Sequence, residues 1–141
     1  IIEKYEIDLI QIPFNILDQR FKTLGLLNLL KLKNIEIYSR SIFLQGILLA
    51  KVESLPNYFI IYKEILNKFR TEVEKLGISV IEACLLSALQ EPIDKIIIGV
   101  TSQKELEQVL KAYETIKGKK FDFTKFAINE ENLINPNRWK I

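Results

Sequence analysis

Residues Lys95 to Leu110 read KIIIGVTSQKELEQVL, and this stretch decides the predicted fold. The run from Lys95 to Gly99 has three consecutive apolar residues, Ile96 to Ile98, which is typical of a strand covered on both faces. Ser102 and Glu105 then have the spacing of a capping box. Apolar residues repeat behind them at helical intervals: Leu106, Val109, Leu110 and Tyr113. A strand followed by an amphipathic helix predicts a βα unit.

The same order of elements is found upstream. Two further β-branched runs, Ile7 to Ile12 (IDLIQI) and Ile35 to Tyr38 (IEIY), predict strands. A helical pattern over Asp18 to Lys33 separates them, with Gly25 as an alternative start. Alternating strands and helices predict a parallel sheet with right-handed crossovers.

Two more helices are predicted between the second and third strands. One covers about Tyr58 to Leu76, and Gly77 is well placed to end it in a left-handed turn. The next begins behind a capping box at Ser79 and Glu82 and ends at Pro92. From residue 117 to residue 141 the chain is a polar tail with aromatic anchors.

Three parallel strands make an incomplete domain. A parallel sheet needs both faces covered and its edges paired. A closed eight-stranded barrel takes about 250 residues, and the chain has 141. We therefore expect an α/β fold that is part of a TIM (β/α)8 barrel, with three C-terminal parallel βα units of the eight.

Composition excludes several classes of protein. Twenty lysine and arginine residues against 18 acidic ones leave a net charge of +2, so no nucleic-acid-binding face is indicated. No apolar run approaches the roughly 18 residues of a membrane span. The chain has no histidine, which excludes a histidine base, nucleophile partner or metal ligand.

Two further features of the composition concern the cellular compartment of the protein and the length of its full sequence. The single cysteine, Cys84, allows no internal disulfide and indicates a reducing, cytoplasmic compartment. The chain contains no methionine and opens with Ile1 and Ile2. We therefore expect it to be a piece of a longer protein.

Four segments, in order, resemble the C-terminal part of the aldo/keto reductase family. They are IDLIQIPFNILDQR (7–20), YSRSIFLQGILL (38–49), IIIGVTSQKELEQVLKA (96–112) and LINPNRW (133–139). The resemblance implies a (β/α)8 barrel that reduces carbonyls with NADPH. Residues 1–141 would then be the C-terminal segment of one barrel domain, with its sixth, seventh and eighth strands near 7–12, 35–38 and 95–99.

The resemblance also implies contacts with the nicotinamide half of the cofactor. Gln11 would bond to the nicotinamide carboxamide, since two amides complement each other. Arg40 would stack on the nicotinamide ring, and Ser41 and Phe43 would contact the pyrophosphate. Without the resemblance, Gln11 is a strand-end glutamine bonded to backbone or water, and the segment at Arg40 is a structural turn.

The turn after the third strand has the composition of an anion site. Gly99, Thr101 and Ser102 lead into a helix N-terminus, where free N–H groups and the helix dipole favour negative charge, and Lys104 adds a positive charge. The resemblance assigns this turn to the adenosine side of the cofactor, including a 2′-phosphate. Alternatively, Ser102 is simply an N-cap.

Two residues depart from the family pattern at this turn. Glu105 stands where the family usually has arginine or glutamine, and a carboxylate repels a phosphate. Val109 cannot hydrogen-bond adenine. NADP is therefore the cofactor that the resemblance implies, with NAD as the alternative.

The family's catalytic aspartate, tyrosine, lysine and histidine belong to earlier strands. None of the five tyrosines here has a matching context, so we assign no catalytic residue and no metal ligand. We expect the enzyme to reduce an aldehyde or ketone, with a sugar-like substrate as one option. We expect the chain alone to be inactive and to associate through exposed barrel edges.

Two alternatives to an enzyme stay open. One is a non-enzymatic barrel that serves as an interaction or regulatory module. The other is an unrelated βα protein that binds a different phosphate ligand at Ser102.

Overall fold

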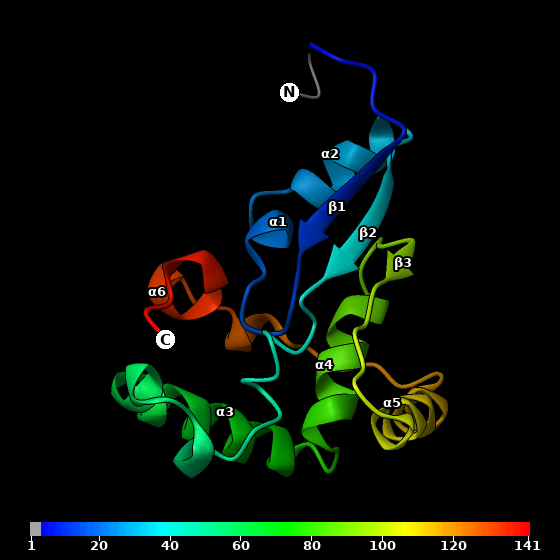
Figure 1. Ribbon diagram of the computed structural model, residues 1–141. Helices are drawn as coiled ribbons and strands as arrows, with labels where there is room; N and C mark the ends of the chain where they lie inside the picture. The colour runs from blue at the N-terminus through cyan, green and yellow to red at the C-terminus, as the bar shows by residue number, and fades with distance from the viewer. Residues whose placement is uncertain (1–3) are drawn as a thin grey trace.

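The computed structural model describes residues 4–141, so Ile1, Ile2 and Glu3 lie outside it. Its sheet has three parallel strands in the order β1 (Leu9–Pro13), β2 (Glu36–Arg40) and β3 (Lys95–Ile96) (Figure 1). This confirms the predicted α/β class. The first two strands end slightly later than predicted. β3 is much shorter than the predicted range from Lys95 to Gly99.

The helices lie on one face of the sheet and beyond the ends of its strands. Their bounds are α1 (Arg20–Thr23), α2 (Leu26–Leu32), α3 (Lys63–Lys75), α4 (Val80–Leu89), α5 (Gln103–Ile116) and α6 (Glu131–Ile134). Short 3-10 turns occur at Val52–Ser54, Asn57–Tyr62, Thr124–Phe126 and Pro136–Arg138. Within residues 4–141, no helix has both the length and the apolar character needed to cross a membrane.

Two predicted helices differ from those observed. The helix expected from Asp18 to Lys33 is split at Gly25, whose φ of +70° is left-handed and ends the helical path of α1. The helix expected from Tyr58 to Leu76 begins as a 3-10 turn before α3. Gly77 does adopt the predicted left-handed turn, at φ +68°.

One face of the sheet is buried and the other is open. Ile12, Ile37 and Ser39 are at most 1% exposed, because helices cover their side of the sheet. Leu9 and Ile97, whose side chains alternate with those of the buried positions, are 41% and 42% exposed. The prediction that the third strand is covered on both faces is therefore wrong for residues 4–141. A closed barrel covers the open face with further strands.

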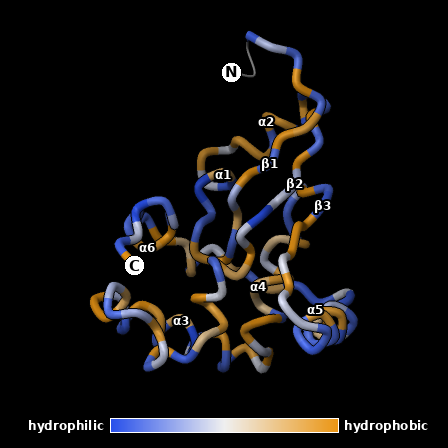
Figure 2. Tube along the Cα trace, viewed as in Figure 1, coloured by the Kyte–Doolittle hydropathy of each residue, from blue (hydrophilic) through white to orange (hydrophobic). Residues whose placement is uncertain are grey.

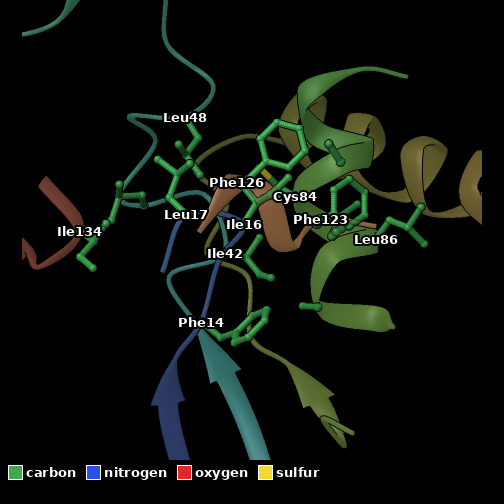
Figure 3. Close-up of a cluster of buried hydrophobic side chains, with 14 of the residues drawn as sticks. Phe14, Ile16, Leu17, Ile42, Leu48, Cys84, Leu86, Phe123, Phe126 and Ile134 are labelled. Atoms are coloured by element: carbon green, nitrogen blue, oxygen red, sulfur yellow. The ribbon is translucent and has the colours of Figure 1, made fainter. Parts of the chain in front are cut away.

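The hydrophobic core lies beyond the carboxyl ends of the strands rather than only beneath the sheet. Figure 3 shows Phe14 and Ile16, which follow β1, beside Ile42, which follows β2, and Cys84 of α4. Phe126 from the tail completes this cluster. In Figure 2, hydrophobic residues gather where these loops meet α4. The core therefore holds the loops after β1 and β2 in fixed positions.

Helix α4 is held at both its start and its buried face. The Ser79 hydroxyl accepts from the Glu82 N–H at 3.3 Å, and the Ser79 N–H donates to the Glu82 carboxylate at 2.6 Å, which confirms the capping box. Cys84 is completely buried on this helix, and burial raises the pKa of its thiol. It is a core residue and not a nucleophile.

Helix α5 differs from its predicted packing. Its predicted apolar face includes Leu106, Leu110 and Tyr113, which are 44%, 54% and 42% exposed. The face that is buried instead contains Ala112 and Ile116. Residues 4–141 thus leave an apolar stripe of α5 without a partner.

Asp94 joins β2 to β3 at the amino end of the sheet. Its carboxylate accepts from the backbone N–H of Ile37 at 2.7 Å and from Lys31 Nζ at 2.7 Å. Its own N–H donates to the carbonyl of Ile37 at 2.9 Å. The hydrogen bonds from Lys31 and Ile37 lower the pKa of the Asp94 carboxyl.

Asp94 therefore makes stability depend on pH. Its folded pKa is depressed, so its contribution is full above the ordinary value of 3.8 and is lost as the pH falls through the folded value. We expect Asp94→Asn to lower the urea midpoint at pH 7 more than at pH 3. Glu64→Gln is the control, since Glu64 is an exposed carboxylate of α3 for which residues 4–141 show no side-chain hydrogen bond or ion pair. Equal losses at both pH values for Asp94→Asn would contradict this role.

Candidate functional site

A cavity of about 610 Å³ opens at the carboxyl ends of β2 and β3. Three segments and one residue of α4 form it. They are the loop after β2 (Arg40, Ser41, Ile42, Phe43, Gln45, Gly46, Leu49), the turn after β3 (Ile97, Ile98, Gly99, Val100, Thr101), part of α5 (Glu105, Gln108, Val109), and Ile81. Parallel pairing brings these segments to the same edge of the sheet (Figure 1).

The cavity brings together most of the residues proposed from the sequence. Five of them line it: Arg40, Ser41, Phe43, Gly99 and Thr101. Ser102 and Lys104 are exposed beside it at the start of α5 and are not lining residues. Gln11 lies apart from it on the open face of the sheet, in register with Tyr38.

The loop after β2 has an unusual backbone. Ser41, Leu44 and Gln45 have φ angles of +63°, +48° and +53°, and Gly46 has +84°. Left-handed conformations at residues other than glycine are uncommon and cost energy. Turn hydrogen bonds hold them, such as that from Leu44 N–H to the Ser41 carbonyl at 2.9 Å. The fold thus keeps this loop in one conformation along the cavity.

Asn15 anchors the loop from the side of β1. It is 1% exposed, and its Oδ1 accepts from the N–H groups of Leu17 and Asp18 at 3.0 and 2.9 Å. Its Nδ2 donates to the Ser41 carbonyl at 3.4 Å. Asn15 therefore orders two loops at once.

Arg70 of α3 anchors the far end of the same loop. Its Nη2 donates to the carbonyls of Leu48 and Ala50, the former at 3.3 Å. Desolvation by burial lowers the pKa of this guanidinium. No sequence pattern marks Arg70 as an anchor, because an arginine within an amphipathic helix gives no sign that it bonds to carbonyls twenty residues away.

The turn before α5 does not offer all the free donors that its sequence predicts. The carboxylate of Glu105 accepts from the Thr101 N–H at 2.7 Å and from the Thr101 hydroxyl at 3.0 Å. The Ser102 hydroxyl accepts from the Glu105 N–H at 3.2 Å as an N-cap. Only half of the predicted capping box forms, because the Glu105 side chain turns to Thr101 rather than to the N–H of Ser102.

The cavity has a positive and a negative residue. Arg40 is exposed, and its Nη1 donates to the Ser41 hydroxyl at 3.2 Å. The hydrogen bonds from Thr101 lower the pKa of Glu105, so its carboxylate is ionised at neutral pH. Within residues 4–141 the lining contains no tyrosine, lysine or cysteine, and no group of three acidic or cysteine side chains could hold a metal ion. The acid-base group of the lining is thus a carboxylate that is ionised at neutral pH, so the lining supplies no general acid.

Parallel βα units with a cavity of mixed apolar and polar lining at the carboxyl ends of their strands define part of an α/β barrel of the kind that binds ligands at this end. The family model described as the aldo/keto reductase family matches residues 2–127. The chain therefore belongs to the aldo/keto reductase family, whose members are oxidoreductases that use NAD(P)H on carbonyl substrates.

Solved structures agree with this fold. An aldo-keto reductase from Bacillus halodurans in its apo form is 16% identical, with a TM-score of 0.67 over 97% of this chain and 48% of that chain. Its holo form is 18% identical, with a TM-score of 0.67 over 97% of this chain and 46% of that one. The chain thus spans about half the length of these proteins. A search of curated proteins found no match.

Removal of the Arg70 guanidinium should free the loop after β2. We expect Arg70→Met to raise the rate of proteolytic cleavage between Leu44 and Ala50 several-fold, because three loop carbonyls lose their donor. Cleavage sites can be mapped by mass spectrometry. Lys68→Met, on the exposed side of the same helix, is the control. Unchanged cleavage in Arg70→Met would show that the loop is held by other contacts.

Proposed function

We propose that the chain is the C-terminal, cofactor-binding part of an NAD(P)H-dependent aldo/keto reductase. The enzyme would reduce an aldehyde or ketone, with a sugar-like molecule as one candidate substrate, in the cytoplasm. Residues 1–141 would belong to a single barrel domain. The observation that carries the proposal is the cavity in which the loop after β2 meets the turn after β3.

The donor set of the loop after β2 fits a pyrophosphate. Arg40 supplies a guanidinium, the group best suited to bind phosphate oxygens, and Ser41 supplies a hydroxyl. In the described part of the chain, the Phe43 N–H donates to no protein acceptor. All three donors lie within residues 40–43 of one ordered loop. We therefore assign Ser41 and Phe43 to the pyrophosphate, and Arg40 to the adjoining nicotinamide ring with its charge toward the same phosphates.

Gln11 would hold the nicotinamide carboxamide from the neighbouring strand. Its side chain lies on the open face of β1, opposite Tyr38 of β2. An amide there can donate and accept at once, as a carboxamide requires. The adenosine half is assigned to the turn formed by Gly99, Thr101 and Ser102, with Lys104 close by.

When bound, the nicotinamide cofactor supplies the hydride for carbonyl reduction. The residues of this chain would bind and orient it, and Ile81 and Val109 would shield it from water. The proton for the carbonyl oxygen needs a general acid, which we place on strands upstream of this chain. A non-enzymatic barrel would have the same fold without this reaction, and the binding measurements below distinguish the two.

Loss of the Arg40 charge should weaken cofactor binding. In the full-length protein, we expect Arg40→Leu to raise the Kd for NADH and NADPH about tenfold or more, since a charge-assisted hydrogen bond contributes about 1.5–3 kcal/mol. Fluorescence titration measures the Kd directly. Lys68→Leu removes the same charge outside the cavity and should leave the Kd unchanged. If wild-type protein binds neither nucleotide, the proposed function is wrong.

The chain by itself should not turn over substrate. We expect residues 1–141 with NADPH and a generic aldehyde to show no oxidation of the cofactor, whereas the full-length protein does, because the general acid lies outside this chain. Absorbance of the reduced nicotinamide follows the reaction. Turnover by the isolated chain would place a catalytic acid within it. An inactive full-length protein that still binds the cofactor would favour the non-enzymatic alternative.

A further inference from the structure

The adenosine end of the proposed site contains a carboxylate, that of Glu105. This carboxylate already accepts hydrogen bonds from groups of the protein that could otherwise bind an anion. Glu105 lines the cavity, and its carboxylate accepts hydrogen bonds from the N–H and the hydroxyl of Thr101. These are two of the donors that the turn would otherwise offer to a phosphate. The oxygen of the Ser102 hydroxyl accepts from the Glu105 N–H as the N-cap, so only its O–H remains to donate to a ligand.

A phosphate at this turn would meet an unfavourable environment. Thr101 could donate to it only if Glu105 moved away, and the displaced carboxylate would remain an anion close to the new one. The carboxylate is held ionised by the same hydrogen bonds. Lys104 is exposed in the first turn of α5 but does not line the cavity, so its charge is poorly placed to offset that of Glu105.

A sugar with free hydroxyl groups fits the same environment. A carboxylate accepts hydrogen bonds from hydroxyl groups, as acidic residues do for the ribose in other dinucleotide sites. Glu105 can accept from them while it keeps its bonds to Thr101, because its two oxygens together have about four acceptor positions.

We infer that Glu105 selects an adenosine ribose with a free 2′-hydroxyl and rejects a 2′-phosphate, so that the protein binds NAD(H) in preference to NADP(H). This inference rests on the proposed function, since it assumes that the cavity holds a nicotinamide dinucleotide. It reverses the cofactor implied by the family resemblance and makes Glu105 the residue that determines specificity.

The test measures binding in the full-length protein by fluorescence titration with NADH and NADPH. We expect wild-type protein to bind NADH at least tenfold more tightly. Glu105→Gln should reduce this ratio, and Glu105→Arg should invert it, because a guanidinium pairs with the 2′-phosphate. Glu107→Gln is the matched control. It removes a carboxylate from the same helix outside the cavity and should leave the ratio unchanged.

A second probe separates the adenosine end from the rest of the cofactor. AMP and adenosine 2′,5′-bisphosphate differ in the 2′-phosphate alone, and calorimetry should show that the wild type prefers AMP and that Glu105→Arg prefers the bisphosphate. Tighter binding of NADPH than NADH by the wild type, or a ratio unaffected by Glu105→Arg, overturns the inference but leaves the proposed function intact. Failure of both dinucleotides to bind overturns the proposed function instead.

Discussion

Parallel pairing of β2 with β3 is the constraint on which the candidate site depends. Parallel strands end at the same edge of a sheet, so the residues that follow Arg40 and those that follow Ile96 meet although some fifty positions separate them. The hydrogen-bonded ladder between β2 and β3 is short, but it is extended at both ends. Asp94 accepts from the Ile37 N–H at one end, and the Ile97 N–H donates to the Ser39 carbonyl at 2.8 Å at the other. A slip of one residue would turn Arg40 to the opposite face of the sheet.

The sequence predicted well those elements of the fold whose formation depends on interactions between neighbouring residues. The capping box at Ser79 and the left-handed turn at Gly77 depend on neighbouring residues alone, and both formed as predicted. The extent of β3 depends on strands beside it, and the run from Ile97 to Gly99 forms no regular ladder. Its apolar residues suit a covered strand, but in residues 4–141 the sheet stays open on that side.

The candidate site was predictable in position but not in its internal bonding. Strand-end residues such as Arg40 and Thr101 could be placed on one edge from topology alone. The direction of a side chain could not be predicted in this way. The capping-box pattern predicted that the Glu105 carboxylate would accept from the N–H of Ser102. It accepts from Thr101 instead. The carbonyl contacts of Arg70 depend on how α3 packs, which no spacing in the sequence encodes.

A helix N-terminus attracts whatever negative charge can reach it, whether that charge comes from a ligand or from the protein. In an anion site at a helix N-terminus, the free backbone N–H groups donate to the ligand, and this gives the site its affinity for an anion. Here Glu105 satisfies the Thr101 donors itself, and a ligand phosphate would first have to displace a carboxylate bonded at 2.7 Å. The helix dipole then stabilises the protein instead of the ligand. The proposed preference for a ribose follows, because sugar hydroxyl groups would donate to the carboxylate that the dipole holds in place.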